Sequence, residues 1–196
     1  MLQVISSSPR ELQPVFDVIL DKAVRICQAD TATLFLYENG TVRRAARHSG
    51  VADAIMPIVP SAKSGTMRSI TTKQIIHIQN YLADPAYLEG DDYVVAGAER
   101  LGIRASLHVP MLREQEVVGA VTIWRREASA FTEKQIDLVA NFAAQAVIAI
   151  EKRAYSTSCA SALPTLPSRW SSRPPPLACS RSLAAPRSIS KPCSKL

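Results

Sequence analysis

The chain has 196 residues, of which 47% are hydrophobic, 23 are basic and 17 are acidic. This length suits one domain with flanking sequence, and this hydrophobic content excludes a chain that is disordered throughout. No apolar run approaches the ~18 residues that span a bilayer, and the first ten residues show no secretory signal. We therefore expect a cytoplasmic protein without a membrane partner.

Two compositions divide the chain near residue 151. All acidic residues and all seven glycines precede residue 152, whereas residues 152–196 hold eight basic residues, seven prolines and eleven serines. This division predicts the end of a linker over 1–9, a folded domain over 10–151 and a disordered, basic Pro/Ser/Arg-rich tail over 152–196. The basic charge belongs to the tail, and the slightly acidic domain offers no basic recognition element. We therefore expect no nucleic-acid partner.

The first half of the domain predicts a helix and a hairpin. Apolar residues recur at three- and four-residue steps over 10–29, which predicts a helix that begins near Pro14. Residues 31–37 and 42–47 predict two strands. The Asn39-Gly40 dipeptide between them accepts the positive φ angles of a tight hairpin turn. Residues 49–60 follow no period.

The second half predicts short elements, then a hairpin and a helix. A helix over 64–72, a strand over 74–78 and a polar loop over 80–102, helical near 94–101, precede strands at 104–112 and 117–125. Thr132 and Gln135 have the spacing of a capping box, which begins the last helix. The order predicts an α+β fold: a central antiparallel β-sheet with the N- and C-terminal helices packed on one face and a loop-covered pocket on the other.

Strand alternation predicts which residues line this pocket. One face of the sheet is aliphatic, whereas the other mixes aromatic and polar side chains: Thr33, Phe35, Ser106, His108, Thr122 and Trp124. An apolar wall with a few orienting polar groups is typical of a small-ligand site. The alternative is a face that is half exposed or merely covered by the middle loop. His108 is the polar residue best placed to contact a ligand, whereas His48 and His77 are expected in solvent.

The sequence predicts no catalytic residue and no metal site. The three histidines lack metal-ligand spacing with cysteine or carboxylate. Asp91-Asp92 is interpreted as a solvated acidic turn. Cys27 lies on the apolar stripe of the first predicted helix, which indicates a buried and unreactive thiol. The cofactor, if any, is unknown.

Three segments taken together resemble the GAF family of small-molecule sensor domains, over Glu11–Glu151. They are Leu107–Leu112 (LHVPML), Val118–Val121 (VGAV) and Phe131–Ile136 (FTEKQI) with the helix that follows. The resemblance implies a non-catalytic regulatory module of bacterial signal transduction. Such a module binds a small molecule, or dimerises through its terminal helices, to control an attached histidine kinase or adenylate/guanylate cyclase. The chain lacks both the Asn-Lys-Phe-Asp-Glu constellation of cyclic-nucleotide binders and the Cys or Asp-Ile-Pro features of bilin binders.

Two other functions stay open. Some GAF-like domains resemble free-methionine-sulfoxide reductases, which need reactive cysteines beside the pocket. The domain could also be a structural dimerisation module without a ligand.

The tail favours a shifted reading frame over an ordinary linker. A one-base shift turns codons that begin with T, such as those of Cys159 and Trp170, into codons for apolar residues. Restoring one base at Lys152, with compatible synonymous codons, allows a helical connector that ends in VLKVISRSPVDLKAVLQA. That segment matches Met1–Val18 at 8 of 18 positions. We therefore expect the chain to be a fragment of a tandem-GAF protein, with a second GAF domain beginning in the tail and the output domain missing.

Overall fold

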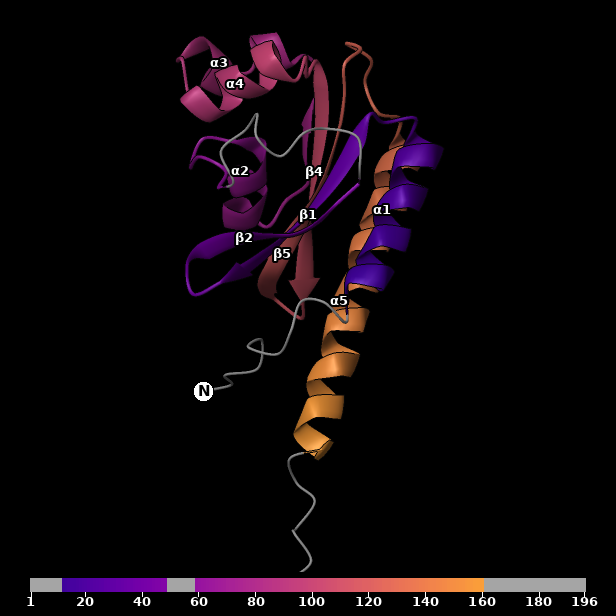
Figure 1. The fold of residues 1–196 in the computed structure, drawn as a ribbon. Helices are drawn as coiled ribbons and strands as arrows, with labels where there is room; N and C mark the ends of the chain where they lie inside the picture. The colour runs from indigo at the N-terminus through magenta and orange to yellow at the C-terminus, as the bar shows by residue number, and fades with distance from the viewer. Residues whose placement is uncertain (1–11, 49–58, 161–196) are drawn as a thin grey trace, which may run out of the picture. The chain divides into compact units, whose positions relative to one another are not determined.

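The computed structural model describes residues 12–48 and 59–160, with side chains up to residue 153. Helix α1 (Gln13–Cys27) and helix α5 (Glu133–Ala160) lie side by side on one face of a five-stranded sheet (Figure 1). Short helices cover the opposite face. The predicted linker over 1–9, and residues 161–196 with the predicted second copy, lie outside the described residues.

The sheet is antiparallel throughout, with the strand order β2-β1-β5-β4-β3. Its strands are β1 (Thr31–Glu38), β2 (Thr41–Arg47), β3 (Ile76–Ile78), β4 (Ala105–Arg113) and β5 (Glu116–Arg125). Asn39 and Gly40 join β1 to β2 with φ angles of 50° and 78°, so the predicted tight turn is confirmed. Strand β5 lies at the centre. The α+β fold predicted from the sequence is confirmed.

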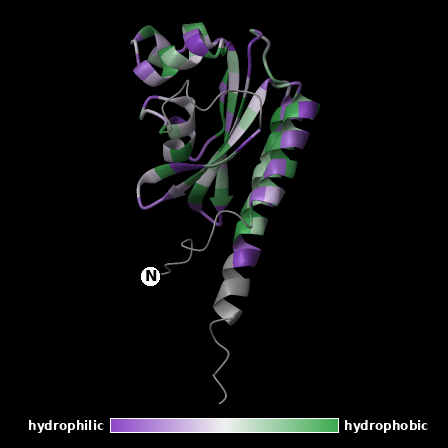
Figure 2. Ribbon diagram, in the orientation of Figure 1, coloured by the Kyte–Doolittle hydropathy of each residue, from purple (hydrophilic) through white to green (hydrophobic). Residues whose placement is uncertain are grey.

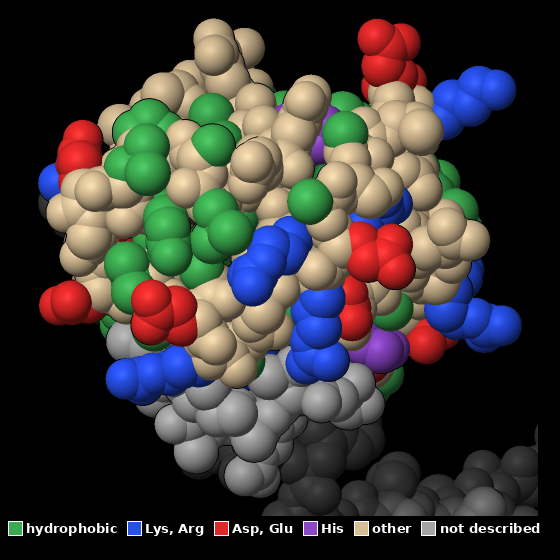
Figure 3. Space-filling model, turned by 90° about the horizontal axis from the view of Figure 1, so that it is seen from above, with side chains coloured by type: hydrophobic (Ala, Val, Ile, Leu, Met, Phe, Trp, Pro, Cys, Tyr) green, Lys and Arg blue, Asp and Glu red, His purple; other side chains and the backbone are tan. Residues whose placement is uncertain are grey.

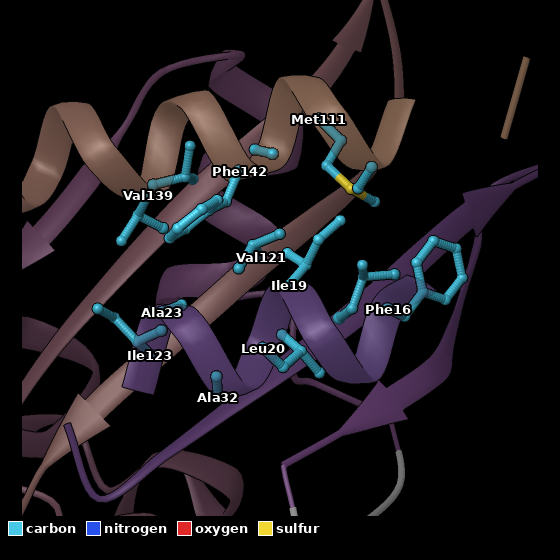
Figure 4. Packing of buried hydrophobic residues seen from close by; sticks show 14 of the residues in the cluster. Phe16, Ile19, Leu20, Ala23, Ala32, Met111, Val121, Ile123, Val139 and Phe142 are labelled. Atoms are coloured by element: carbon cyan, nitrogen blue, oxygen red, sulfur yellow. The ribbon is translucent and has the colours of Figure 1, made fainter. Parts of the chain in front are cut away.

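The main core lies between the sheet and the two long helices. Phe16, Leu20 and Ala23 of α1 and Val139 of α5 pack against strand residues such as Val121 (Figure 4). Burial of each large side chain contributes about 1.5–3 kcal/mol. Hydrophobic and hydrophilic residues alternate along α1, as the helical period predicts (Figure 2).

The capping box at the start of α5 forms as predicted. The Gln135 amide donates to the Thr132 hydroxyl at 3.3 Å, and the Thr132 amide donates to the Gln135 side chain at 3.0 Å. At its other end α5 continues to Ala160, nine residues beyond the expected end of the domain at Glu151. Residues 152–160 contain neither proline nor glycine, so no residue in this stretch breaks the helix.

The segment 80–102 is more helical than the sequence predicts: the helix expected near 94–101 is present as α4 (Asp92–Arg100), but two short helices before it were not predicted. With α2 (Gly65–Thr72) before it, this segment forms the 3-10 helix η3 (Tyr81–Ala83), α3 (Pro85–Leu88) and α4 (Asp92–Arg100). The side chains of Asn80, Asp84 and Asp91 accept backbone amide hydrogen bonds and cap the three helices. Asp91 is therefore an N-cap residue and not part of a solvated acidic turn.

Within the described ranges, none of the helices combines the length and the hydropathy needed to cross a bilayer. Figure 3 shows the molecule from above relative to Figure 1, and on this face acidic and basic side chains are intermixed.

Candidate functional site

A small cavity lies on the face of the sheet that is opposite α1 and α5. Two apolar clusters flank it, one that includes Phe35 and Ile70 and another that includes Val94 and Trp124. Its volume is about 50 Å³. Ligand pockets of drug-sized molecules usually measure about 300–1,000 Å³, so only a small molecule or group fits here.

All six residues predicted for the pocket line this one cavity. Thr33 and Phe35 come from β1, Ser106 and His108 from β4, and Thr122 and Trp124 from β5. The cross-strand register sets Thr122 between Thr33 and His108, and it sets Trp124 opposite Ser106. The strands alternate regularly over these positions, so the side chains that the sequence pattern groups together face the same side of the sheet.

His108 forms the centre of a buried hydrogen-bond network. Its Nε2 lies 3.0 Å from the Ser106 hydroxyl, and its Nδ1 lies 3.1 Å from Thr66 Oγ1 and 3.2 Å from Thr122 Oγ1. The hydroxyls of Thr66 and Thr122 are themselves 3.2 Å apart. Burial, with a smaller effect of the Arg68 charge, lowers the pKa of His108 to about 3. The ring is therefore neutral at pH 7, with one nitrogen as donor and the other as acceptor.

Eight further cavity residues were not predicted from the sequence: Arg44, Arg47, Ser64, Thr66, Tyr81, Tyr93, Leu101 and Ile103. Ser64 and Thr66 reach the cavity because α2 begins against the sheet. A Cβ at Gly65 would overlap the imidazole of His108. A glycine between two hydroxyl residues at a helix start is the one sequence signal that indicates this close approach.

Both tyrosines of the cavity are neutral phenols. Burial raises the pKa of Tyr93 to about 12, although the charges of Arg47 and Arg44 lower it. Burial also raises the pKa of Tyr81. Nearby, Arg68 and the buried Asp84 form an ion pair at 2.6 Å.

The sequence predicted the other two histidines to lie in solvent, and this prediction is wrong. His77 is half-buried, and its Nε2 accepts the Phe131 backbone N–H at 3.1 Å. Its position at the sheet edge brings it against the loop that precedes α5. Burial lowers the pKa of His77, and the Arg125 charge adds to this effect. His48 is also half-buried, with Nε2 3.7 Å from Asp21.

Cys27 lies apart from the cavity, in the core between α1 and α5. Its side chain is fully buried, and burial raises the pKa of its thiol despite the opposing effect of Arg125. Over residues 12–48 and 59–160, no cluster of three His, Cys, Asp or Glu side chains could hold a metal ion.

An antiparallel sheet with two long helices on one face and a small polar cavity on the other defines the class of two-layer α+β domains. The GAF domain model matches residues 11–150, so the chain belongs to the GAF family. Among curated proteins, none matches the chain.

Solved structures confirm the fold. A domain of a putative two-component sensor histidine kinase protein from Sinorhizobium meliloti is 18% identical, with a TM-score of 0.62 over 80% of this chain and 100% of that one. The GAF domain region of a putative membrane protein from Geobacter sulfurreducens is 19% identical, with a TM-score of 0.62 over 73% and 95%. The type II free methionine-R-sulfoxide reductase from Thermoplasma acidophilum is 12% identical, with a TM-score of 0.59 over 74% and 95%.

Proposed function

We propose that the chain is a non-catalytic sensory module that binds a small molecule in the cavity and thereby controls an attached output domain. The observation that carries this proposal is the buried network of His108, Ser106, Thr66 and Thr122 that lines the cavity. The hydroxyls of this network line the cavity, so they can also hydrogen-bond to a ligand with matching polar groups. The family and the sensor histidine kinase neighbour support a regulatory role.

A physical route connects the cavity to the terminal helices. Thr122 and Trp124 line the cavity, and Arg125 follows them on β5. Arg125 donates to the Cys27 carbonyl at the end of α1 and to the Gln135 side chain at the start of α5. A shift of β5 would therefore move the anchor of both helices. A ligand controls the output only if it binds one helix arrangement better than the other.

The second part of the proposal is a homodimer through α1 and α5. Val15 and Val18 of α1 are 42% and 54% exposed, and Ile148 of α5 is 49% exposed. A shallow groove lined by residues of α1 and by Gln145 of α5 adjoins them. Contiguous exposed apolar surface marks an interface, and a second copy presents a matching apolar surface about a twofold axis.

Two alternatives each have one observation in their favour. The likeness to a methionine sulfoxide reductase structure favours an enzyme. Against it, Cys27 lies outside the cavity and its thiol pKa is raised. The cavity of about 50 Å³ favours a dimerisation module without a ligand.

Native mass spectrometry and tryptophan fluorescence separate these functions. The chain has two tryptophans, so a Trp170→Phe variant makes Trp124 of the cavity the sole reporter. A sensory module gives a dimer with a retained small molecule, and displacing that molecule changes the Trp124 emission. A dimer without any small molecule, and with Trp124 unresponsive to every compound tried, establishes the ligand-free module. Turnover of methionine sulfoxide establishes the enzyme.

The tail carries a separate proposal. Residues 152–196 are proposed to be the product of a shifted reading frame, which in the unshifted frame encodes a helical connector and the start of a second GAF domain before a kinase or cyclase. The composition change at residue 152 supports this. The coding DNA tests it directly: a one-base restoration at Lys152 must continue the open frame, and a stop codon there refutes the proposal.

A further inference from the structure

The Tyr81 side chain brings a buried hydroxyl to the cavity. Tyr81 begins the 3-10 helix η3, and its backbone N–H donates to the Arg104 carbonyl just before β4 at 2.8 Å. The residue is 4% exposed and packs with Val94 and Trp124 in the apolar cluster on this face of the sheet. Its hydroxyl lies against Gly97 of α4, where an added Cβ would stand 3.3 Å from the oxygen. Packing against η3, α4 and the sheet therefore fixes the position of the hydroxyl.

The hydroxyls of Tyr81 and Thr33 differ from the others in the lining because they lack hydrogen-bond partners. Thr33 is 7% exposed, and both residues line the cavity. Neither hydroxyl makes a hydrogen bond to any residue that the structure describes. The remaining serine and threonine hydroxyls of the lining all have partners. A buried hydroxyl without a partner has a free-energy cost, and a ligand that hydrogen-bonds to it removes this cost.

Two arginines also line the cavity, because β2 carries a β-bulge. On β1, Thr33 pairs with Arg47 and Phe35 pairs with Arg44. One residue of β1 but two of β2 stand between these pairs, and Ala45 is the extra one. The bulge therefore sets both arginines on the cavity side of the sheet. Each arginine already has an interaction partner in the chain, so neither is counted as a charge available to a ligand.

The other ionisable groups at this site are either neutral or paired at pH 7. Burial lowers the pKa of His108 to about 3 and raises the pKa of Tyr93 to about 12. Burial also raises the pKa of Tyr81. The nearby buried carboxylate of Asp84 is paired with Arg68. Burying an unpaired charge costs much more free energy than burying a hydrogen-bonded neutral group, so these surroundings favour an uncharged ligand.

We propose that the cavity takes a small uncharged carbonyl compound, a primary amide in particular, whose oxygen accepts a hydrogen bond from the Tyr81 hydroxyl. This inference rests on the proposed function, since it names the ligand class for the same cavity. The Thr33 hydroxyl accepts a hydrogen bond from the amide N–H. A water molecule needs about 10–15 Å³ of cavity, so the volume of about 50 Å³ takes a molecule of a few non-hydrogen atoms.

Three molecules of the same shape test the ligand class: propionamide, butanone and propionate. Propionamide has both the acceptor oxygen and the N–H donors, butanone has only the acceptor, and propionate carries a charge. Trp124 fluorescence and calorimetry measure their binding to the Trp170→Phe chain up to about 100 mM, because molecules this small bind weakly. We expect propionamide to bind about tenfold more tightly than propionate and about threefold more tightly than butanone.

Tyr81→Phe removes the proposed donor. This change should weaken the binding of propionamide and of butanone by about 3- to 10-fold, because each loses one hydrogen bond. It should leave stability in urea unchanged, since the hydroxyl has no partner among the described residues. Tyr87→Phe is the matched control, because Tyr87 packs against the same apolar cluster but does not line the cavity. Its replacement should leave all three affinities unchanged.

Thr33→Val is a second variant, which decides the test if Tyr81→Phe fails to fold. Valine keeps the shape of threonine and its preference for a strand, but it lacks the hydroxyl. The replacement should weaken propionamide binding by about 3- to 10-fold and leave butanone binding unchanged, because butanone has no hydrogen to donate. Equal effects on the two probes contradict the assigned role of Thr33.

The outcomes separate the ligand class from the sensory function. Propionate binding as tightly as propionamide overturns the uncharged-ligand assignment but leaves a ligand cavity. Tyr81→Phe binding propionamide as tightly as the unaltered chain, or no more weakly than Tyr87→Phe, also overturns it. If none of the three probes changes the Trp124 emission or gives a heat of binding, the assignment is wrong as well. If native mass spectrometry then also finds no retained molecule, the sensory function fails with it.

Discussion

Replacing Arg125 by methionine tests how the sheet is joined to the two long helices. Arg125 is 8% exposed and has no carboxylate among its hydrogen-bond acceptors. Its Nη2 donates to the Cys27 carbonyl and, at 3.1 Å, to Gln135 Oε1, while Nη1 donates to Ser129 Oγ at 3.1 Å. The guanidinium also lies 4.1 Å from the centroid of the Phe131 ring.

The magnitude follows from which acceptors keep a partner. Charge-assisted hydrogen bonds contribute about 1.5–3 kcal/mol each, and an exposed or partly exposed cation–π contact about 0.5–1 kcal/mol. In the variant, the Cys27 carbonyl still accepts from Gln135 Nε2, and Gln135 Oε1 still accepts from the Thr132 amide. The loss of stability is therefore smaller than the sum of these contributions. We expect the free energy of unfolding to decrease by about 2–3 kcal/mol, which lowers Tm by about 4–12 °C for a domain of this size.

Urea unfolding at pH 7, followed by circular dichroism, measures this change. Arg113→Met is the control, since Arg113 forms an exposed ion pair with Glu116 at 3.4 Å, and such pairs contribute about 0–1 kcal/mol. A decrease below about 0.5 kcal/mol for Arg125→Met would refute the reasoning. It would show that the two helices are held by core packing alone and that Arg125 does not couple β5 to them.

Four further predictions concern the cavity, the thiol and the dimer. Gly65→Ala should destabilise the fold by about 1–3 kcal/mol in urea, because its Cβ overlaps His108; unchanged stability would mean that α2 moves freely. The unfolded chain binds a proton at His108 below pH ~6.5, whereas the folded chain does so only near pH 3, so stability falls as pH drops through this window. His108→Gln should flatten that dependence between pH 7 and 4.5 relative to the unaltered chain, and equal slopes contradict it. With Cys159, Cys179 and Cys193 replaced by serine, Cys27 should react with a disulfide reagent only on unfolding; fast native reaction would favour the reductase. Val18→Glu should dissociate the proposed dimer in sedimentation, whereas Leu88→Glu, at a more exposed position on α3, should not.

The sequence pattern predicted the elements whose signals are local. Asn39-Gly40 specifies its turn by backbone preference alone, and Thr132 with Gln135 caps α5 through its own neighbours. The cavity residues on β1, β4 and β5 followed from period-two alternation, which these strands obey at those positions.

The features that sequence reasoning missed depend on irregular or distant contacts. Ala45 gives no compositional sign of a bulge, so alternation assigns Arg44 and Arg47 to opposite faces. Thr66 enters the cavity through long-range packing of α2. The caps of η3, α3 and α4 were interpreted as loop residues, because asparagine and aspartate favour turns and helix starts alike.

The hydrogen-bond network around His108 has two arrangements of its protons. If Nδ1 carries the hydrogen, it donates to the hydroxyl of Thr66 or Thr122, and Nε2 accepts a hydrogen bond from the Ser106 hydroxyl. If Nε2 carries the hydrogen, the ring donates to the Ser106 oxygen. The Ser106 hydroxyl can then donate its own hydrogen bond to an acceptor in the cavity. An acceptor in the cavity therefore selects the second tautomer, and a donor selects the first. The site can therefore offer the ligand either a hydrogen-bond donor or an acceptor without moving its heavy atoms, because only the hydrogens change place. Nitrogen-15 chemical shifts of the imidazole would record this change of tautomer.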